Sequence, residues 1–486
     1  MVSAAGRAAP LPPEEPAATL EAHLARAPLS HTQWLAWGLA AAGKFLEGLV
    51  VFIGGLVLPL LDAQLALAPL QRGAVAAAGL VGILVGSLAF GGLADRWGRR
   101  PVFIAEMVLL LVGLLLAGLS PDAGTLMAGL LIVGLALGAD YPTAHLVIAE
   151  SCPAALRGRL VLGAFSCQAL GVVSGSALVA AVLQLSPQPG AWRWFYLLPI
   201  LPVLLLTALR VRLPESSHWL LSRGQRADAE EALACLLERP GLRLLPVSGT
   251  GESGATAASP SMASQSLSWP AALRQLASPP WRRATCLAVV PWFLQDLGTY
   301  GIGIFLPLLL GRALTPEASP DPIGAELLAA RISLLIDLAL LAGFAAAISG
   351  TDRWGRMPLQ ISGFLGCGVG LLLAAAGMGG AARPQQLPLL VSGLLLFQFM
   401  TNLGPNAQTY LLAGELFPTA VRGRAAGLAA AAGKVAAVLA ALLVPVALQR
   451  WGAEPLLLSL AGTSVSGALV TWLCRIETNG DVLADD

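Results

Sequence analysis

The sequence has little charge, and this scarcity limits the kinds of protein that it can encode. Asp, Glu, Lys and Arg together make up 12% of the 486 residues, whereas hydrophobic residues make up 56%. A soluble protein of this length carries roughly twice that share of charged residues. The charges nearly cancel, at a formal net charge of +1, and nucleic-acid-binding domains usually carry a strongly basic surface. Composition therefore favours a membrane protein without a nucleic-acid partner.

Cysteine and histidine are also scarce, and neither is arranged as a metal site. The six cysteines are scattered without a Cys-x-x-Cys pair, and no histidine lies near them at the spacing of a zinc site. We interpret the cysteines as reduced packing residues and expect neither a metal ion nor another cofactor. The chain starts with a stretch rich in Pro and Ala, which does not resemble a secretory signal peptide.

Apolar runs of bilayer length dominate the rest of the chain. A helix needs about 20 apolar residues to cross a bilayer, and the sequence contains twelve such runs. They cover residues 34–61, 74–92, 102–120, 125–149, 160–185, 192–211, 283–310, 327–349, 358–378, 387–416, 421–448 and 455–474. We therefore expect an all-α membrane protein with twelve transmembrane helices.

The basic residues lie mostly on one side of these spans. Arginines follow the second, fourth, eighth and tenth spans, and more of them, beginning with Arg210, occupy the segment after the sixth. Positively charged loops stay on the cytoplasmic side of a membrane. Both termini should therefore be cytoplasmic, as tails at 1–33 and 475–486. The loops carry arginine, and the only lysines, Lys44 and Lys434, fall within spans, so lysine appears only at membrane depth.

Two loop motifs occur twice in the chain. "LADRWGRRP" (93–101) after the second span returns as "GTDRWGRMP" (350–358) after the eighth. "ESCPAALRGR" (150–159) after the fourth span returns as "ELFPTAVRGR" (415–424) after the tenth. Repeats in the same orientation indicate two equivalent halves, with a binding site near the midplane between them.

This repeat divides the chain into two pseudo-symmetric bundles of six helices, at 34–212 and 283–474. The segment between them, 213–282, should be a cytoplasmic linker. It opens with a stretch suited to short helices and continues as "VSGTGESGATAASPSMASQS". Such a Gly-, Ser- and Ala-rich composition is typical of disordered chain, so we expect the linker to be partly disordered.

The same motifs resemble those of the major facilitator superfamily. "GGLADRWGRRP" and its second copy match the cytoplasmic loop signatures, and "PESSHWLLSRG" resembles the sugar-porter branches. "GADYPTAH", "FSCQALG", "WFLQDLGTYG", "NLGPNAQTYLLAGELFPT" and "AAGKVAA" are similar to signatures of the phosphate:proton symporters. They also resemble metabolite:proton symporters that are related to synaptic vesicle glycoproteins. The resemblance covers nearly the whole chain and implies the major facilitator fold.

Polar side chains interrupt the spans at one depth. At a rise of about 1.5 Å per residue, Asp140 lies about 15 Å from the loop residue Glu150. Gln168, Asp296, Asn406, Lys434 and Glu47 fall at similar depths in five other spans. An intramembrane charge costs about 2.5–3.5 kcal/mol on insertion scales and is a functional candidate by default. A central cavity between the halves would require this common depth.

The resemblance implies roles for these residues. Proton coupling would involve Glu47, Asp140 and Asp296, since burial disfavours the charged form of a carboxyl group. The candidates for substrate binding are Tyr141, Gln168, Trp292, Tyr300, Asn406 and Lys434, of which Trp292, Asp296 and Tyr300 share one helix face. The gating candidates at the loop motifs are Asp95, Arg96, Arg99, Glu150, Arg157, Asp352, Arg353, Arg356, Glu415 and Arg422.

Several residues keep a purely structural alternative. Asp140 and Asp296 could form static ion pairs with lysine, and Trp292 and Tyr300 could be core aromatics. The roles of Lys44, His145 and Asp337 stay open. His145 lies near the inner end of its span and is better suited to a helix contact than to a proton relay.

These observations predict a secondary active transporter of the inner or plasma membrane. We expect a monomer that moves a small anionic metabolite together with protons by alternating access, and that is not an enzyme. One alternative is an inorganic phosphate:proton symporter. Phosphate symporters tend to have two carboxylates in the first span, whereas this chain has Glu47 and then Val50. The other alternative is a non-transporting membrane sensor on the same fold.

Overall fold

The computed structural model describes residues 18–25, 28–65, 67, 69–245, 269–314, 322–378, 386–417 and 419–476. Twelve helical segments in this part are long and apolar enough to cross a membrane. This confirms the all-α membrane fold that the apolar runs predict. The Gly- and Ser-rich part of the linker lies outside the described residues.

Each half contributes six of these spans, built from one or two helices apiece. In the first half they are α2 (His31–Leu65), α3 (Pro69–Trp97), α4 (Arg99–Gly118), α5 (Ala123–Ser151), α6 (Ala154–Leu185) and the pair α7 (Trp192–Leu197) and α8 (Ile200–Arg210). In the second half they are α12 (Arg282–Leu314), α13 (Pro322–Trp354), α14 (Arg356–Met378), the pair α15 (Leu387–Leu403) and α16 (Pro405–Glu415), α17 (Thr419–Arg450) and α18 (Ala453–Cys474).

Two spans that the sequence predicts as single helices are interrupted, and proline explains the interruptions. The sixth span divides into α7 and α8 around Leu198 and Pro199, and the tenth divides into α15 and α16 at Gly404 and Pro405. Proline lacks the N–H group that a continuous helix requires. Gly404 also lies so close to α14 that a Cβ there would be 2.4 Å from the carbonyl oxygen of Leu359.

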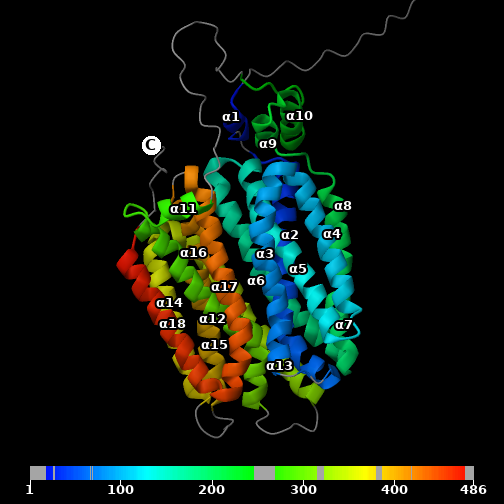
Figure 1. Cartoon of the computed structure of the whole chain (residues 1–486), viewed down its shortest axis with the longest axis vertical. Helices are drawn as coiled ribbons and strands as arrows, with labels where there is room; N and C mark the ends of the chain where they lie inside the picture. Colours follow the sequence, from blue (N-terminus) through cyan, green and yellow to red (C-terminus); the bar gives the residue numbers. More distant parts are fainter. Residues whose placement is uncertain are drawn as a thin grey trace, which may run out of the picture.

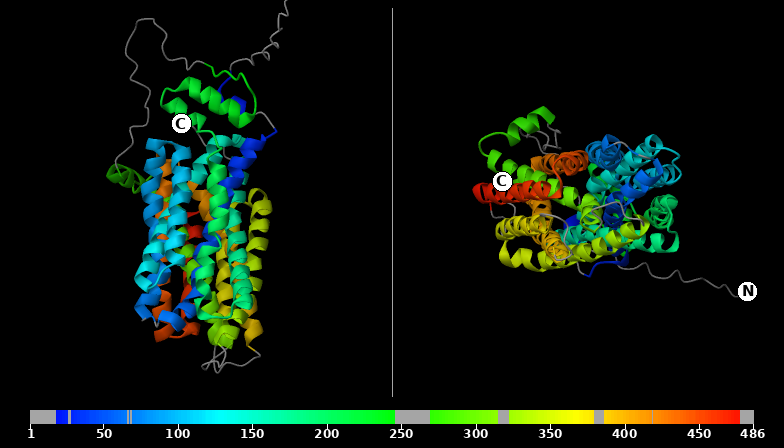
Figure 2. Two further views of the ribbon diagram at one scale, coloured as in Figure 1. Left: turned by 90° about the vertical axis from the view of Figure 1, so that its right-hand side faces the viewer. Right: turned by 90° about the horizontal axis from the view of Figure 1, so that it is seen from below.

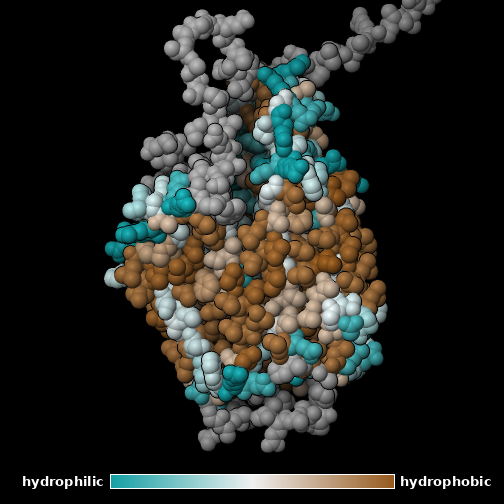
Figure 3. All heavy atoms as spheres, in the orientation of Figure 1, coloured by the Kyte–Doolittle hydropathy of each residue, from teal (hydrophilic) through white to brown (hydrophobic). Residues whose placement is uncertain are grey.

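The two halves stand side by side, and three helix pairs make most of the contact between them (Figures 1 and 2). The helix α3 packs against α17, α6 against α13, and α2 against α12. A Cβ on Gly55 of α2 would lie 1.5 Å from the carbonyl oxygen of Ile304 of α12. Only glycine permits this approach between helix backbones. The face drawn in Figure 3 carries a broad apolar band across its middle, with polar residues toward both ends.

We call the end of the bundle with the repeated loop motifs the motif end, and the opposite end the far end. Three short helices, α1 (Leu20–Leu24), α9 (Ser217–Ser222) and α10 (Arg226–Leu237), form a small cap at the motif end (Figure 1). Leu24 and Leu233 are part of its apolar core. The first part of the linker is therefore folded, as its sequence predicts. Two other short helices are η1 (Pro189–Ala191) and α11 (Trp269–Leu276).

The glycine of each "DRWGR" motif lies at a sharp turn between two spans. Gly98 has φ 103° and Gly355 has φ 88°, a backbone region that side chains with a Cβ rarely adopt. Glu215 lies directly beside the first turn. Its carboxylate accepts from the backbone N–H of Arg99 at 2.9 Å and so satisfies one of the free donors at the start of α4.

We expect Gly98→Ala to destabilise the protein by about 1–3 kcal/mol. The backbone conformation would be strained, and the new Cβ would lie 2.3 Å from Glu215 Oε2. The thermal unfolding midpoint in detergent measures this loss. Gly92→Ala in α3 is the matched control, since a Cβ there meets nothing within 4 Å. Equal midpoints for the two variants would contradict this account of the motif.

Candidate functional site

Charged side chains gather at mid-depth in the first half. Lys44 Nζ lies 3.3 Å from Glu47 Oε2 on the next turn of α2, and 3.8 Å from Asp140 Oδ2 of α5. The phenol of Tyr141 donates to Glu47 Oε1 at 2.5 Å. All four side chains are buried. The structure thus contains the contact between Lys44 and Glu47 that their spacing on one helix face suggests.

Two further charged residues of this cluster, Arg210 and Glu106, were not predicted from the sequence. Arg210 is expected in the loop after the sixth span, but its side chain is fully buried at the end of α8. Its guanidinium donates to Asp140 Oδ1 at 3.1 Å, pairs with Glu106 of α4 and lies over the Phe103 ring. The expectation that Arg210 belongs to the segment after the sixth span is therefore wrong. An arginine at the end of an apolar run can face either water or the bundle, and only the packing of α8 decides between them.

A second charged group lies in the other half, around Lys434 of α17. Its ammonium donates to the hydroxyl of Tyr300 at 2.7 Å and lies 3.7 Å from Asp296 Oδ2. The neighbouring Gly433 allows α12 to approach, because a Cβ there would lie 2.8 Å from both Asp296 Oδ2 and Trp292 Nε1. The shared face of Trp292, Asp296 and Tyr300 therefore packs against the turn of α17 that carries the lysine.

The ring of Tyr141 connects the two charged groups. Lys44 Nζ lies 3.2 Å from the centre of the ring, and Lys434 Nζ, from the other half, lies 4.8 Å from it. Both distances are within the range of cation–π attraction. We call the whole set the central charge layer, and its charged members are Lys44, Glu47, Glu106, Asp140, Arg210, Asp296 and Lys434.

Two stacked aromatic pairs bound this layer, and each pair takes one ring from each half. Phe52 of α2 and Tyr300 of α12 stack with their centres 5.4 Å apart. Phe165 of α6 and Tyr410 of α16 stack at 4.4 Å with an interplanar angle of 7°. The first pair lies toward the far end and the second toward the motif end. Contacts between the halves therefore exist on both sides of the charges.

The two amides expected to bind substrate have different surroundings. The amide nitrogen of Asn406 donates to Asn402 at 2.8 Å, and its oxygen accepts from Gln295 at 3.2 Å. Gln295 was not predicted as a site residue, although it precedes Asp296 directly. The backbone of Gln168 lies next to the first-half cluster. A Cβ on Gly48 would be 1.9 Å from the backbone carbonyl oxygen of Gln168.

His145 and Asp337, whose roles the sequence also leaves open, have partners outside the two charged groups. His145 meets the ring of Tyr410 edge-on, with centres 6.4 Å apart, which agrees with its interpretation as a helix contact. Asp337 lies between α6 and α13, where it accepts a hydrogen bond from Ser176 at 2.7 Å.

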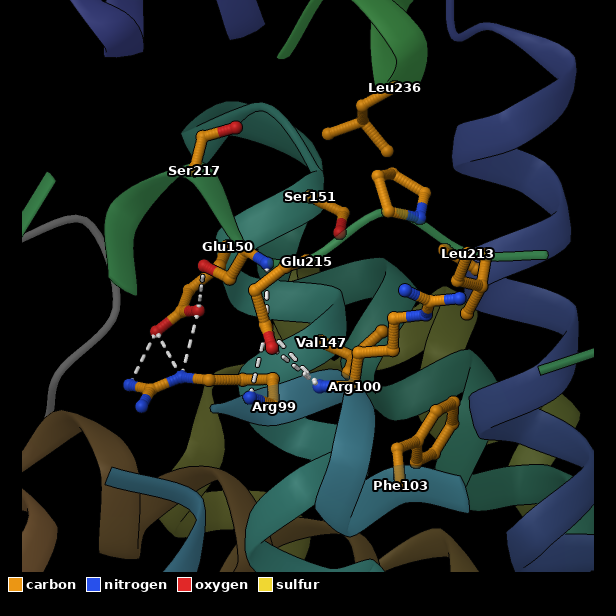
Figure 4. A pocket seen from close by; sticks show the side chains of 13 residues that line it. Arg99, Arg100, Phe103, Val147, Glu150, Ser151, Leu213, Glu215, Ser217 and Leu236 are labelled. Atoms are coloured by element: carbon orange, nitrogen blue, oxygen red, sulfur yellow. Dashed lines mark hydrogen bonds and ion pairs between the residues drawn. The ribbon is translucent and has the colours of Figure 1, made fainter. Parts of the chain in front are cut away.

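Each half holds an Arg–Glu ion pair at the motif end. Arg99 Nη2 lies 3.0 Å from Glu150 Oε1, and Arg356 Nε lies 3.1 Å from Glu415 Oε2. Figure 4 shows the first pair in a pocket that is also lined by Glu215. Asp95 adds a second carboxylate, 3.0 Å from Arg99. Each pair joins helix ends within one half, at equivalent places in the two repeated motifs.

Three of the other gating candidates have described side chains. Arg157 lies 3.6 Å from Glu21 of α1, so it contacts the cap. Arg96 and Arg353 are exposed. The side chains of Asp352 and Arg422 lie outside the described part of the structure. Their roles stay predictions.

Comparison with known proteins identifies the family of this chain. The family model described as "Sugar (and other) transporter" matches residues 37–485. The chain belongs to this transporter family. The match covers both halves and the linker, so the transporter assignment applies to the whole membrane-embedded part.

The curated relatives of this transporter are named for different substrates. The inner membrane metabolite transport protein YgcS of Escherichia coli is 29% identical over 441 residues, which cover 89% of this chain and 88% of that protein. The niacin transporter NiaP of Acinetobacter baylyi is 28% identical, covering 84% and 86%. The inorganic phosphate transporter 1-1 of Oryza sativa subsp. japonica is 26% identical, covering 91% and 92%. These relatives are transporters rather than enzymes.

Solved structures confirm the fold of the transporter. The partially occluded inward-open form of the xylose transporter XylE from E. coli matches with a TM-score of 0.73 and 19% identity, covering 93% of this chain and 100% of that one. The proton:xylose symporter XylE bound to 6-bromo-6-deoxy-D-glucose matches with a TM-score of 0.71 and 20% identity, covering 94% and 98%. Identity this low supports the major facilitator fold alone.

We expect Arg210→Met to be strongly destabilising, by about 3–5 kcal/mol. The substitution removes the guanidinium that pairs with Glu106 and Asp140, and both carboxyl groups stay buried. The double variant Glu106→Gln/Arg210→Met should recover part of the loss. Thermal unfolding of the transporter in detergent measures both. The control is Arg212→Met, two residues further on, whose side chain is exposed. A loss for Arg210→Met no larger than that of the control would contradict the buried pairing.

Proposed function

We propose that this transporter is a proton-coupled symporter of a small anionic metabolite. The observation that carries the proposal is the position of Lys44 and Lys434, which approach one aromatic ring from opposite halves. An anion between the two lysines would bind both halves at once. Such a ligand stabilises the closed form, in which the two halves meet around it.

The balance of charge in the central charge layer supports coupling to protons. Three cations, Lys44, Arg210 and Lys434, face four buried carboxyl groups, Glu47, Glu106, Asp140 and Asp296. An uncompensated charge in a dry interior is costly. A proton on one carboxyl group would therefore make the empty layer neutral. An anion that binds the lysines competes with Asp140 and Asp296, and each displaced carboxylate then favours a further proton.

The orientation follows from the basic residues. The motif end carries most of the arginines of the chain, so it should face the cytoplasm, and both tails would lie there. We propose that the protein acts as a monomer in an inner or plasma membrane. Opening at the motif end would require the ring contact between Phe165 and Tyr410 to separate, and opening at the far end that between Phe52 and Tyr300.

Two alternatives differ in what they predict. Inorganic phosphate is the substrate named for some relatives, such as the rice transporter. A phosphate with two negative charges would require more protons for neutrality than a monocarboxylate does. A non-transporting sensor would bind its ligand without moving it across the membrane. The charged centre and both Arg–Glu pairs at the motif end support a carrier that changes conformation.

The direct test is uptake into proteoliposomes made with the purified protein. We expect an inward proton gradient to drive accumulation of labelled nicotinate, an organic monoanion, and a protonophore to abolish it. Inorganic phosphate and the neutral sugar D-xylose complete the panel. Gradient-driven uptake of xylose alone would contradict an anionic substrate, and phosphate uptake alone would favour the first alternative. Saturable binding of any of the three without uptake would favour a sensor.

We expect Asp296→Asn to abolish gradient-driven accumulation and to spare exchange of substrate between equal pools. The neutral amide resembles the protonated acid, so the carrier can still cycle when loaded but cannot release a proton. Asp140→Asn is the matched comparison, because Asp140 is buried at the same depth but pairs with Arg210 as well as Lys44. If only Asp140→Asn loses accumulation, the proton site lies in α5. If both variants keep it, proton symport through these two residues is wrong.

A further inference from the structure

One face of α13 carries a polar row along the boundary between the two halves. Glu326, Ser333 and Asp337 are spaced i, i+7 and i+11, so they lie on the same side of the helix. All three side chains are buried. Phe344 continues this face toward the motif end and packs against Phe165 of α6, with ring centres 5.8 Å apart. The row therefore faces the first half of the protein and not lipid.

Asp337 has two hydrogen-bond donors, and neither carries a charge. Ser176 of α6 donates to Oδ2 at 2.7 Å, and Gln398 of α15 donates to Oδ1 at 3.1 Å. Ser176 belongs to the first half and Gln398 to the second. The buried carboxyl group thus bridges the halves.

No cation compensates Asp337 among the described residues. The helices packed against α13 are α2, α6, α12, α14 and α15. Lys44 and Glu47 of α2, and Asp296 and Tyr300 of α12, have their partners in the central charge layer. The charged groups of α6, Arg157 and Arg159, and of α14, Arg356, belong to the motif end, and α15 contains no charged residue. The thiols of Cys167 in α6 and Cys367 in α14 are not cations. Arg331 of α13 itself is exposed. Asp337 therefore differs from Asp140 and Asp296, which both face a basic side chain.

Two buried polar atoms of the row have no hydrogen-bond partner. They are Oε1 of Glu326 and Oγ of Ser333. Glu326 lies one turn from the start of α13 at the far end, and Asp337 lies about 16 Å deeper at a rise of about 1.5 Å per residue. Ser333 lies between them. Buried polar atoms of this kind commonly bind internal water, which can connect groups too far apart for direct contact.

We propose that Asp337 is a proton-binding site between the two halves, and that protons reach it from the far end along Glu326 and Ser333. In each transfer, a proton moves from water at the far end to the Glu326 carboxylate, and then through water beside Ser333 to the Asp337 carboxylate. No other bond changes. This route is separate from the central charge layer, so a proton can enter while the substrate site is closed by its aromatic pairs.

The position of Asp337 connects this proton to the movement of the halves. When α6 moves away from α13, the hydrogen bond from Ser176 is lost, and an ionised Asp337 would keep one neutral donor. Protonation removes that unfavourable charge, so the separated state favours the protonated acid. This consequence rests on the proposed proton symport, whereas the proton site itself does not depend on it.

Infrared difference spectroscopy of the purified protein tests the site without any substrate. A pH step should produce a carboxyl C=O band that Asp337→Asn removes and that Ser176→Ala shifts to higher frequency, because a hydrogen bond to the acid is lost. Glu326→Gln and Ser333→Ala should keep the band but slow its shift after transfer from H2O to D2O at least several-fold. The Ser176→Ala result keeps the test valid if Asp337→Asn does not fold.

Matched controls are Asp62→Asn and Ser392→Ala. Asp62 is a far-end carboxylate paired with the half-exposed Arg72, and Ser392 is an exposed serine of α15. Neither should alter the band. An unchanged spectrum in both Asp337→Asn and Ser176→Ala would overturn the proton site. Unchanged isotope exchange in Glu326→Gln and Ser333→Ala would overturn the route.

Transport assays distinguish a failure of this inference from a failure of the proposed function. With nicotinate and inorganic phosphate as probes, Asp337→Asn should lower gradient-driven accumulation at least tenfold and leave exchange within twofold of wild type. Full accumulation by the variant would overturn the role of Asp337 in coupling. No gradient-driven uptake by wild-type protein would instead count against the proposed function and leave the infrared result unaffected.

Discussion

The need to pair the buried cations of the central charge layer is the constraint on which this structure depends. Lys44, Asp140 and Arg210 come from three different helices of the first half, and each has an opposite charge within reach. Removing one member would leave its partner in a medium that solvates ions poorly. The requirement therefore determines where α2, α5 and α8 can sit relative to one another. It also concentrates the chemistry of the protein at one level.

Close backbone contacts bring the charged helices together. Gly48 of α2 meets the backbone of α6, Gly55 meets α12 and Gly433 of α17 meets the side chains of Trp292 and Asp296. These positions have no room for a side chain, so helices approach more closely than larger residues allow. The lysines can reach Tyr141 from both sides because the surrounding helices are this close. The positions of the buried charges therefore depend on the close packing of the helices.

The carboxyl groups of the protein fall into two environments with different consequences. Asp140 and Asp296 lie beside basic side chains, Asp140 beside Lys44 and Arg210 and Asp296 beside Lys434. Asp337 lies between two neutral donors at the boundary of the halves. A movement of the halves changes the surroundings of Asp337 directly, whereas Asp140 keeps its partners within the first half. The two kinds of site can therefore respond to different steps of one transport cycle.

The sequence alone determined the twelve spans and, through the two repeated loop motifs, pointed to two halves, because each depends on local composition or on similarity between short segments. It also placed Glu47, Asp140, Asp296 and Lys434 at one depth, since helical rise converts residue number into distance. The side chains that these residues contact could not be predicted in this way. The pairing of Arg210 with Glu106 and the bridge between Ser176 and Asp337 join residues far apart in the chain. Such pairs depend on how each helix is rotated about its axis, and an almost uniformly apolar helix shows little sign of that rotation in its sequence. Packing between the helices decides it.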